Sequence, residues 1–216
     1  RWRKPFFKGE ALEVRNSELA ASGYAAVWAT ENTREAIFAA MKRRETYATT
    51  GPRMTVRFFG GWEFVPGDEH APDPARRGYA GGVPMGGDLP APATAGAAPG
   101  FLVAALKDPE GANLDRIQIV KGWHDADGEL HEKVYDVALA DGRDPGADAA
   151  SIGSSVDVAR ASYSNSIGDA ELAAVWRDPG FDPAPSAFYY ARVIEIPTPR
   201  WTARDAEYFG AGMDRA

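Results

Sequence analysis

The feature that most constrains the fold is a set of short segments in which apolar and polar residues alternate. RMTVRFFGGWEF at residues 53–64 and LDRIQIVKGW at residues 114–123 both show this alternation. Further short, apolar-rich segments lie at residues 100–108 and 131–140, and turns rich in Pro, Gly and Asp separate them. Successive side chains of a strand point to opposite faces, so each segment predicts a strand with one buried face. Together they predict a mainly β fold, a β-sandwich of immunoglobulin-like or similar type.

Two later segments extend this prediction. AFYYARVIEI at residues 187–196 is apolar on nearly both faces, which is typical of a central strand in a sandwich. The proline that follows cannot donate to a ladder and would end the strand. In contrast, GDAELAAVWRDP at residues 168–179 is interpreted as a short helix that ends before Asp178-Pro179.

The clearest helix lies at residues 31–45, ENTREAIFAAMKRRE. Asn32 is a suitable N-cap, and Glu35 stands in the capping-box position three residues later. Basic residues of the last turn complement the helix dipole, so they need no anion-binding role. One face of this helix is apolar and consists of Ile37, Phe38 and Met41.

A change from helical to strand periodicity places a domain boundary at Gly51-Pro52. Residues 1–51 would form an N-terminal helix–strand unit, and residues 52–216 the β domain. Residues 66–100 are rich in Pro, Gly and Ala, which predicts a long surface loop carrying one short strand near residues 83–89. The glycines of GGVPMGG in this loop lack the Lys and Ser/Thr of a phosphate-binding loop.

Composition excludes several classes of function. The net charge of −7 and the pI of about 5.1 argue against nucleic acid or an anionic membrane as the main partner. Without cysteine the chain has no disulfide, thiolate nucleophile or cysteine zinc site. No apolar run approaches the roughly 20 residues that span a membrane, and the N-terminal segment lacks a signal-peptide core.

One hairpin could hold a metal ion. In WHDADGELH, residues 123–131, Asp127-Gly128 is a strong signal for a two-residue turn. Such a turn would place His124 directly opposite His131, with Glu129 on the same face, and this trio could bind a transition metal. The alternative is an exposed hairpin with two solvated histidines, because the sequence supplies no convincing third ligand.

Other catalytic patterns are missing from the sequence. It contains no G-x-S-x-G elbow, no H-E-x-x-H and no Walker motif. The remaining histidine, His70, lies in the predicted 66–100 loop, and three scattered histidines cannot build the cluster of a typical metallohydrolase. Paired aspartates fall in turns, where Asp is favoured for local hydrogen bonds.

Several long stretches together resemble the C-terminal part of a bacterial family of unknown function, domain of unknown function (DUF) family 3604. By this resemblance the family is related to the PHP metal-dependent phosphoesterases, whose distorted β/α barrel holds metal ions with His and Asp residues. The resemblance covers nearly the whole chain from about residue 20. Its stretches are SGYAAVWATENTREAIFAAMKRRETYATTGPRMTVRFFGGW, FLVAALKDPEGANLDRIQIVKGW, EKVYDVALADGR, YSNSIGDAEL and FYYARVIEIPTPRW.

The resemblance implies a fragment of a larger enzyme. Residues 22–51 would be the last helix and final short strand of a PHP-like barrel, and residues 52–216 a β-sandwich appended to it. The His-x-His and Ser-Asp-Thr-His type motifs of such a barrel do not occur in this chain, so no metal ligand carries over to it. Divalent ions (Mn, Zn or Fe) are expected only in the full-length parent, where a metal-activated water would attack a phosphate or related ester.

The chain alone is therefore expected to be inactive. In the parent, the segment between barrel and sandwich could face the metal site and contact an anionic substrate. Its candidate residues are Arg44, Tyr47, Thr49, Thr50 and Arg53.

An alternative of a different class is a non-catalytic β-sandwich module for binding, structure or oligomerisation. The expected partners are the missing barrel portion, a second copy of the chain, and a small ester substrate in the parent. A bacterial periplasmic or secreted location is favoured over the cytoplasm.

Overall fold

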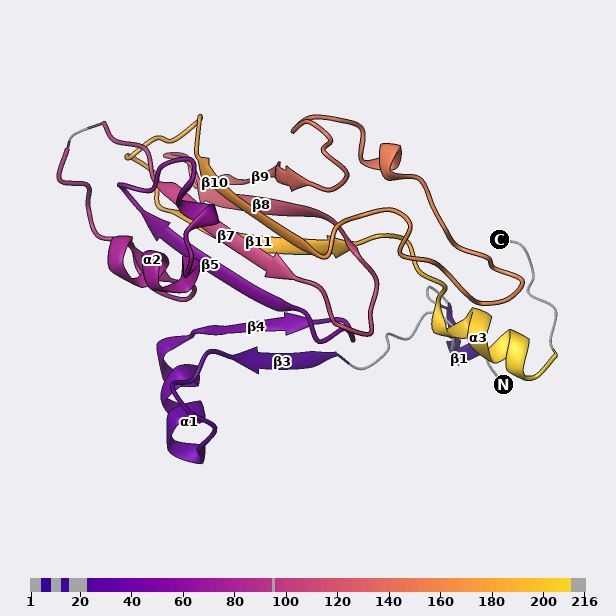
Figure 1. Cartoon of the computed structure of the whole chain (residues 1–216). Helices are drawn as coiled ribbons and strands as arrows, with labels where there is room; N and C mark the ends of the chain where they lie inside the picture. Colours follow the sequence, from indigo (N-terminus) through magenta and orange to yellow (C-terminus); the bar gives the residue numbers. More distant parts are fainter. Residues whose placement is uncertain (1–4, 9–12, 16–22, 95, 211–216) are drawn as a thin grey trace.

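A computed structural model describes residues 5–8, 13–15, 23–94 and 96–210, and Figure 1 shows the arrangement of their elements. The chain is mainly β, as predicted. None of the helices in these ranges is long and apolar enough to cross a membrane. The helices are α1 Arg34–Arg43, α2 Pro74–Gly81 and α3 Trp201–Tyr208, with 3-10 turns η2 Asp68–His70 and η3 Ala149–Ile152. The strands are β1 Pro5–Lys8, β2 Glu13–Arg15, β3 Tyr24–Val27, β4 Thr46–Thr49, β5 Thr55–Gly61, β6 Val83–Pro84, β7 Gly100–Leu106, β8 Leu114–His124, β9 Leu130–Leu139, β10 Glu171–Arg177 and β11 Ala187–Glu195.

Two antiparallel sheets share one hydrophobic core. The first has the strand order β10-β7-β5-β6 and the second β11-β8-β9. Side chains from both sheets meet in the core, among them Phe58, Val103, Ile117, Ile119 and Val137, all with at most 9% of their surface exposed. This confirms the mainly β prediction, whereas the immunoglobulin-like type remains a prediction.

The strand β3 pairs antiparallel with β4, and α1 connects them. The N-cap of α1 is Thr33, not Asn32 as the sequence suggested: the Thr33 hydroxyl accepts a hydrogen bond from the Ala36 N–H at 3.3 Å. The helix ends at Arg43. Its C-cap, Arg44, has a left-handed backbone (φ 64°), and the Arg44 N–H donates to carbonyls of the last turn. The 51/52 domain boundary remains a prediction.

The 66–100 region is more ordered than a loop. It contains α2, which begins at Asp73-Pro74, where the Asp73 carboxylate accepts from the Arg76 N–H at 2.9 Å. No helix was predicted here, although an N-cap Asp followed by Pro at the first helical position is a recognised helix start signal. The short strand expected near residues 83–89 exists as β6, which pairs with β5 through Phe59 and Gly60.

Two predictions, one of a helix and one of a central strand, are wrong. Residues 168–179 were predicted to be a short helix, but residues 171–177 form β10, because the full length of this segment pairs with β7. The segment 187–195, predicted to be a central strand, is an edge strand that pairs only with β8 among the described strands. On one face of this strand the aromatic side chains of Phe188 and Tyr190 are exposed, next to the candidate site described below.

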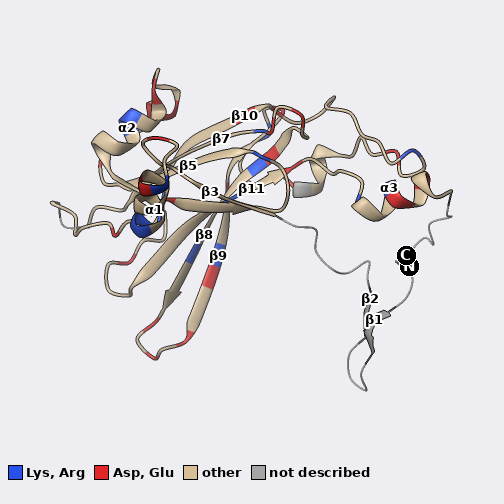
Figure 2. Cartoon of the chain, turned by 90° about the horizontal axis from the view of Figure 1, so that it is seen from below, with Lys and Arg blue, Asp and Glu red and all other residues tan. Residues whose placement is uncertain are grey.

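The hairpin of β8 and β9 projects beyond the other strands, and both signs of charge lie along it (Figure 2).

Candidate functional site

A groove of about 930 Å³ lies between the start of β11 and the wall formed by β4, β5 and residues 83–92. Of the described residues that line it, only Arg44 and Asp88 carry a charge, and both stand in the β4 and 83–92 wall. Apart from Thr46, the remaining lining is apolar or aromatic. Its aromatic members are Tyr47, Phe58, Trp62, Phe101, Phe181, Phe188, Tyr189 and Tyr190.

The groove opens onto the core shared by the two sheets. Phe58 and Phe101 line it and are also core residues, with 7% and 4% of their surface exposed. Their rings stack at 5.5 Å between centroids, and Tyr189 of β11 packs on Phe101 at 4.4 Å. A ligand in the groove would therefore contact the side chains that hold the sheets together.

The rim of the groove exposes further aromatic surface. Phe188 is 63% exposed and lies over Gly122 of the neighbouring strand β8, where a Cβ would come within 2.3 Å of its ring. Tyr190 is 43% exposed on the same strand. Trp62 is fixed by a hydrogen bond from its indole N–H to the Pro90 carbonyl (2.9 Å) and by an edge contact with Phe181. Exposed aromatic side chains gathered in one place are typical of interaction sites.

Of the candidate residues from the sequence, the structure brings Arg44 and Tyr47 to the groove and leaves Thr49, Thr50 and Arg53 outside its lining. The Arg44 guanidinium is exposed and lies 3.5 Å from the Asp88 carboxylate. The Tyr47 hydroxyl donates to the Met54 carbonyl at 3.0 Å, and burial raises the pKa of Tyr47. The Arg53 N–H donates to the Asp108 carboxylate at 2.6 Å.

The segment around these residues is a polar joint between α1 and the β domain. The Glu45 carboxylate, 5% exposed, pairs with Arg43 at 2.7 Å and accepts from the Tyr79 hydroxyl of α2 at 2.7 Å. Arg57 of β5 stacks on the Trp28 ring at 3.2 Å to its centroid. The Trp28 indole N–H in turn donates to the Val56 carbonyl at 2.8 Å. These contacts fix β4 as one wall of the groove.

The histidine hairpin differs from its predicted pairing. Trp123 pairs with His131 and His124 with Leu130, so the two histidines point to opposite faces. The turn is one residue longer than predicted: the Gly128 N–H donates to the Asp125 carbonyl, and Gly128 has a positive φ of 82°.

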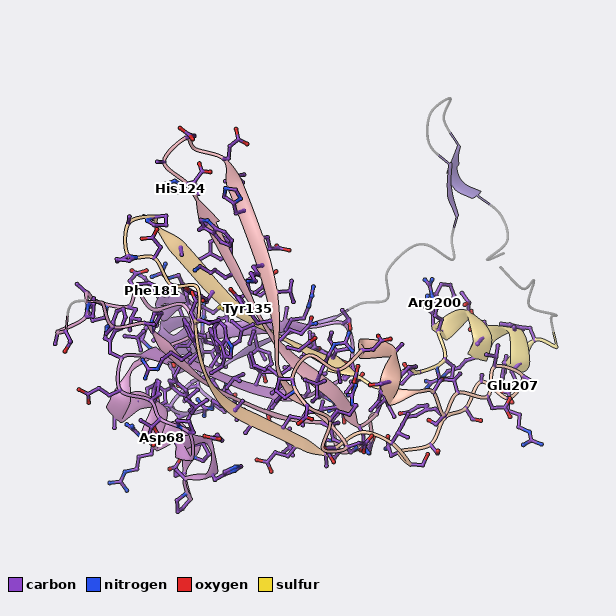
Figure 3. All side chains as sticks on the ribbon, turned by 90° about the horizontal axis from the view of Figure 1, so that it is seen from above. Asp68, His124, Tyr135, Phe181, Arg200 and Glu207 are labelled. Atoms are coloured by element: carbon purple, nitrogen blue, oxygen red, sulfur yellow. The ribbon has the colours of Figure 1, made fainter. Side chains whose placement is uncertain are left out.

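The hairpin histidines do not fit a shared metal. His131 stacks on Trp123 and its Nε2 lies 2.8 Å from an Asp125 oxygen, which gives it a partner already. Figure 3 shows His124 near the outer end of the hairpin. In the ranges that the structure describes, no group of three or more His, Asp or Glu side chains is placed to hold a metal ion.

Beside the groove floor lies a buried ion pair that sequence reasoning missed. The Lys121 ammonium is 2.7 Å from the Asp178 carboxylate, which also accepts from the Tyr189 hydroxyl at 2.7 Å. Burial alone would raise the pKa of Asp178, but the hydrogen bonds from Lys121, Tyr189 and the Gly180 N–H hold it below its usual range. Lys121, Asp178 and Tyr189 all have hydrogen-bond partners within this cluster, which holds the Tyr189 side chain in place.

The far end of β11 carries a carboxyl group, that of Glu195, whose pKa is raised. Burial of Glu195, with a smaller contribution from the nearby Asp108 carboxylate, raises its pKa to about 7, although the Lys107 ammonium opposes this. Its Oε1 is buried and has no hydrogen-bond partner within the part of the chain that the structure describes. Lys107 does not pair with it, because the ammonium is bound to the carbonyls of Asp108, Pro109 and Gly111.

These observations define a mainly β protein with an aromatic groove on an open sheet edge. The chain belongs to the family described as "Protein of unknown function (DUF3604)", whose model matches residues 2–216. The match extends the stretches of sequence resemblance to almost the entire chain. Neither the curated proteins nor the solved structures contain a match to this chain.

Proposed function

We propose that this chain is the non-catalytic β-sandwich portion of a PHP-type metal-dependent hydrolase, and that its groove is a binding site. The hydrolase part rests on the sequence resemblance. In the parent the metal would activate water for attack on a phosphate or related ester. The residues of this chain do not fit that metal, since its two hairpin histidines lie on opposite faces and His131 is engaged by Asp125.

The groove is the observation that carries the binding role. Its volume of about 930 Å³ lies at the upper end of the range typical of ligand sites, ~300–1,000 Å³. Its lining is mostly apolar, and its charged pair, Arg44 and Asp88, is exposed to an approaching ligand. Ligand sites commonly combine an apolar surface with a few placed polar groups.

Metal content and turnover test the hydrolase part. The 216-residue chain and a longer form that carries the His and Asp motifs are purified side by side. Elemental analysis and hydrolysis of p-nitrophenyl phosphate are then measured on both. We expect stoichiometric metal and turnover only in the longer form. Stoichiometric metal or turnover in the 216-residue chain would overturn the proposal.

The role of Arg44 is tested in the longer form by Arg44→Ala, with Arg76→Ala on α2 as an exposed arginine control outside the groove lining. A rise in KM for an anionic ester with Arg44→Ala alone would support a substrate contact. Unchanged kinetics in both variants would remove Arg44 from the substrate site.

A second candidate, an oligomerisation module, is favoured by the apolar face of α1. Phe38 and Met41 on this face are 62% and 52% exposed, whereas Ala40 on the other side is buried. If the face binds a second copy, Phe38→Ser lowers the mass seen in sedimentation equilibrium to that of one chain. A single-chain mass for the unsubstituted protein at all concentrations would exclude this candidate.

A further inference from the structure

The strand β11 presents a free edge to the groove. It pairs with β8 on one side only, and Ala187–Ala191 line the groove on the other. Every second residue of an edge strand points its N–H and C=O away from its neighbour. Among the described residues, no further backbone group bonds to the segment 187–191. Along the groove wall, backbone donors and acceptors of this strand therefore have no backbone partner among the described residues.

This edge lacks the protection that the opposite edge of the same sheet has. The outer strand β9 carries Glu132 and Lys133 in its exposed half. Charged side chains on an edge discourage pairing with another strand. The groove half of β11 has the sequence AFYYA and no charge. An unprotected edge beside exposed aromatic rings is what strand addition requires.

The shape of the groove selects the occupant. The wall opposite β11 is formed by β4, β5 and residues 83–92, so the edge faces another part of the same chain across the groove. A second folded copy would bring its own β8 and β9 with its β11 and would have to accommodate them beside this wall. A single extended chain can enter, and the floor beneath it is Phe58 and Phe101 of the core.

We infer that the groove binds an extended peptide segment of a partner protein, which adds to the free edge of β11 as a further strand. Residues 187–191 span roughly 16 Å at ~3.3 Å per residue, so about five residues of the peptide pair with them. Alternate side chains of the peptide point to Phe58 and Phe101 and are apolar. The intervening side chains lie beside Phe188 and Tyr190. Since the lining carries charge only at Arg44 and Asp88, the paired residues of the peptide are uncharged.

This inference rests on the proposed binding role of the groove but not on the hydrolase part. The test is selection of peptides from a displayed library of random nine-residue sequences on the purified 216-residue chain. A counter-selection is made on the variant Ala48→Trp, which places an indole at an exposed position of the groove wall. We expect enriched peptides with apolar residues at alternate positions and at least tenfold weaker binding to Ala48→Trp.

Two refinements separate strand addition from simple apolar contact. Phe188→Ala removes a cross-strand neighbour and is expected to weaken a selected peptide about tenfold, which corresponds to ~1.4 kcal/mol. The matched control is Phe209→Ala, whose ring is similarly exposed (71% against 63%) but follows α3 outside the groove lining. Alternate amides of a strand point to opposite edges, so two N-methylated peptides are compared, one methylated on each edge. Methylation on the edge that pairs with β11 is expected to abolish binding, and methylation on the other edge is expected to leave it intact.

Several results would overturn the inference. These are no enrichment over Ala48→Trp, equal effects of Phe188→Ala and Phe209→Ala, or binding insensitive to N-methylation on both edges. Protection of the 187–191 amides in a concentration-dependent dimer without peptide would assign the edge to a second copy instead. Turnover by the 216-residue chain would overturn the hydrolase proposal and leave the peptide result standing, so the two failures are distinguishable.

Discussion

Replacing Glu195 with glutamine is expected to stabilise the protein above neutral pH and to have little effect in mild acid. The side chain is half-buried, its Oε1 has no hydrogen-bond partner, and burial raises its pKa from 4.5 to about 7. Between these two values the folded protein binds more protons than the unfolded chain, so stability falls as the pH rises through this window. Glutamine has the same shape and no charge, so it removes the cost of ionising Glu195.

The magnitude follows from the difference between the two pKa values, 7 − 4.5 = 2.5. At ~1.36 kcal/mol for each pH unit this corresponds to ~3.4 kcal/mol. Partial exposure allows water to screen the carboxylate, and we therefore expect roughly half of this value, ~1.5–2 kcal/mol, at about pH 8. Near about pH 4.5 the folded protein already holds Glu195 protonated, and the expected gain is close to zero.

The assay is urea denaturation followed by tryptophan fluorescence at several pH values between about 4.5 and 8. The exposed Glu132→Gln on β9 is the control, since that side chain is solvated. The stability difference between Glu195→Gln and the unsubstituted protein should grow with pH, and that of the control should stay flat. A pH-independent difference, or a loss of stability at pH 8, would refute the reasoning.

Three further substitutions are measured by the same denaturation assay at neutral pH. Arg44→Gly should stabilise by roughly 0.5–1 kcal/mol, because a left-handed residue after a helix suits glycine; an unchanged midpoint would contradict this. Gly78→Ala should destabilise by ~1–3 kcal/mol, since its Cβ would lie 2.3 Å from the buried Phe59 ring; tolerance of alanine would show that the ring can move. Lys121→Met should cost roughly 3–5 kcal/mol by leaving the Asp178 carboxylate buried without its cation, and a loss under ~1 kcal/mol would count against a structural ion pair.

Local patterns in the sequence were sufficient for much of the fold. Alternation at residues 114–123 predicted β8, and the periodicity and basic last turn at residues 31–45 predicted α1. The Asp127-Gly128 signal correctly located a hairpin. Each of these features depends on neighbours within one turn of helix or one strand, and such short-range preferences are readable from a single sequence.

The candidate site required the tertiary structure. Arg44 and Tyr47 were predicted as site residues, but the aromatic lining from β5, β7 and β11 was not, because these strands meet only after long-range pairing. The edge position of the apolar segment 187–195 also could not be read from the sequence, because its free edge lies next to a groove and not next to a second strand. The helix α2, which lies outside the groove lining, could have been predicted from its Asp73-Pro74 start.

The sequence by itself determined that the segments of β5, β7, β8, β9 and β11 become strands and where the clearest helix lies, but not that residues 171–177 form a strand. The tertiary structure decided the register that separates His124 from His131, the edge position of β11 and the groove beside it. The physical reason is that alternation is a property of one strand, whereas register and neighbours are set by pairing between strands. A turn longer by one residue is enough to move every side chain of a strand to the other face.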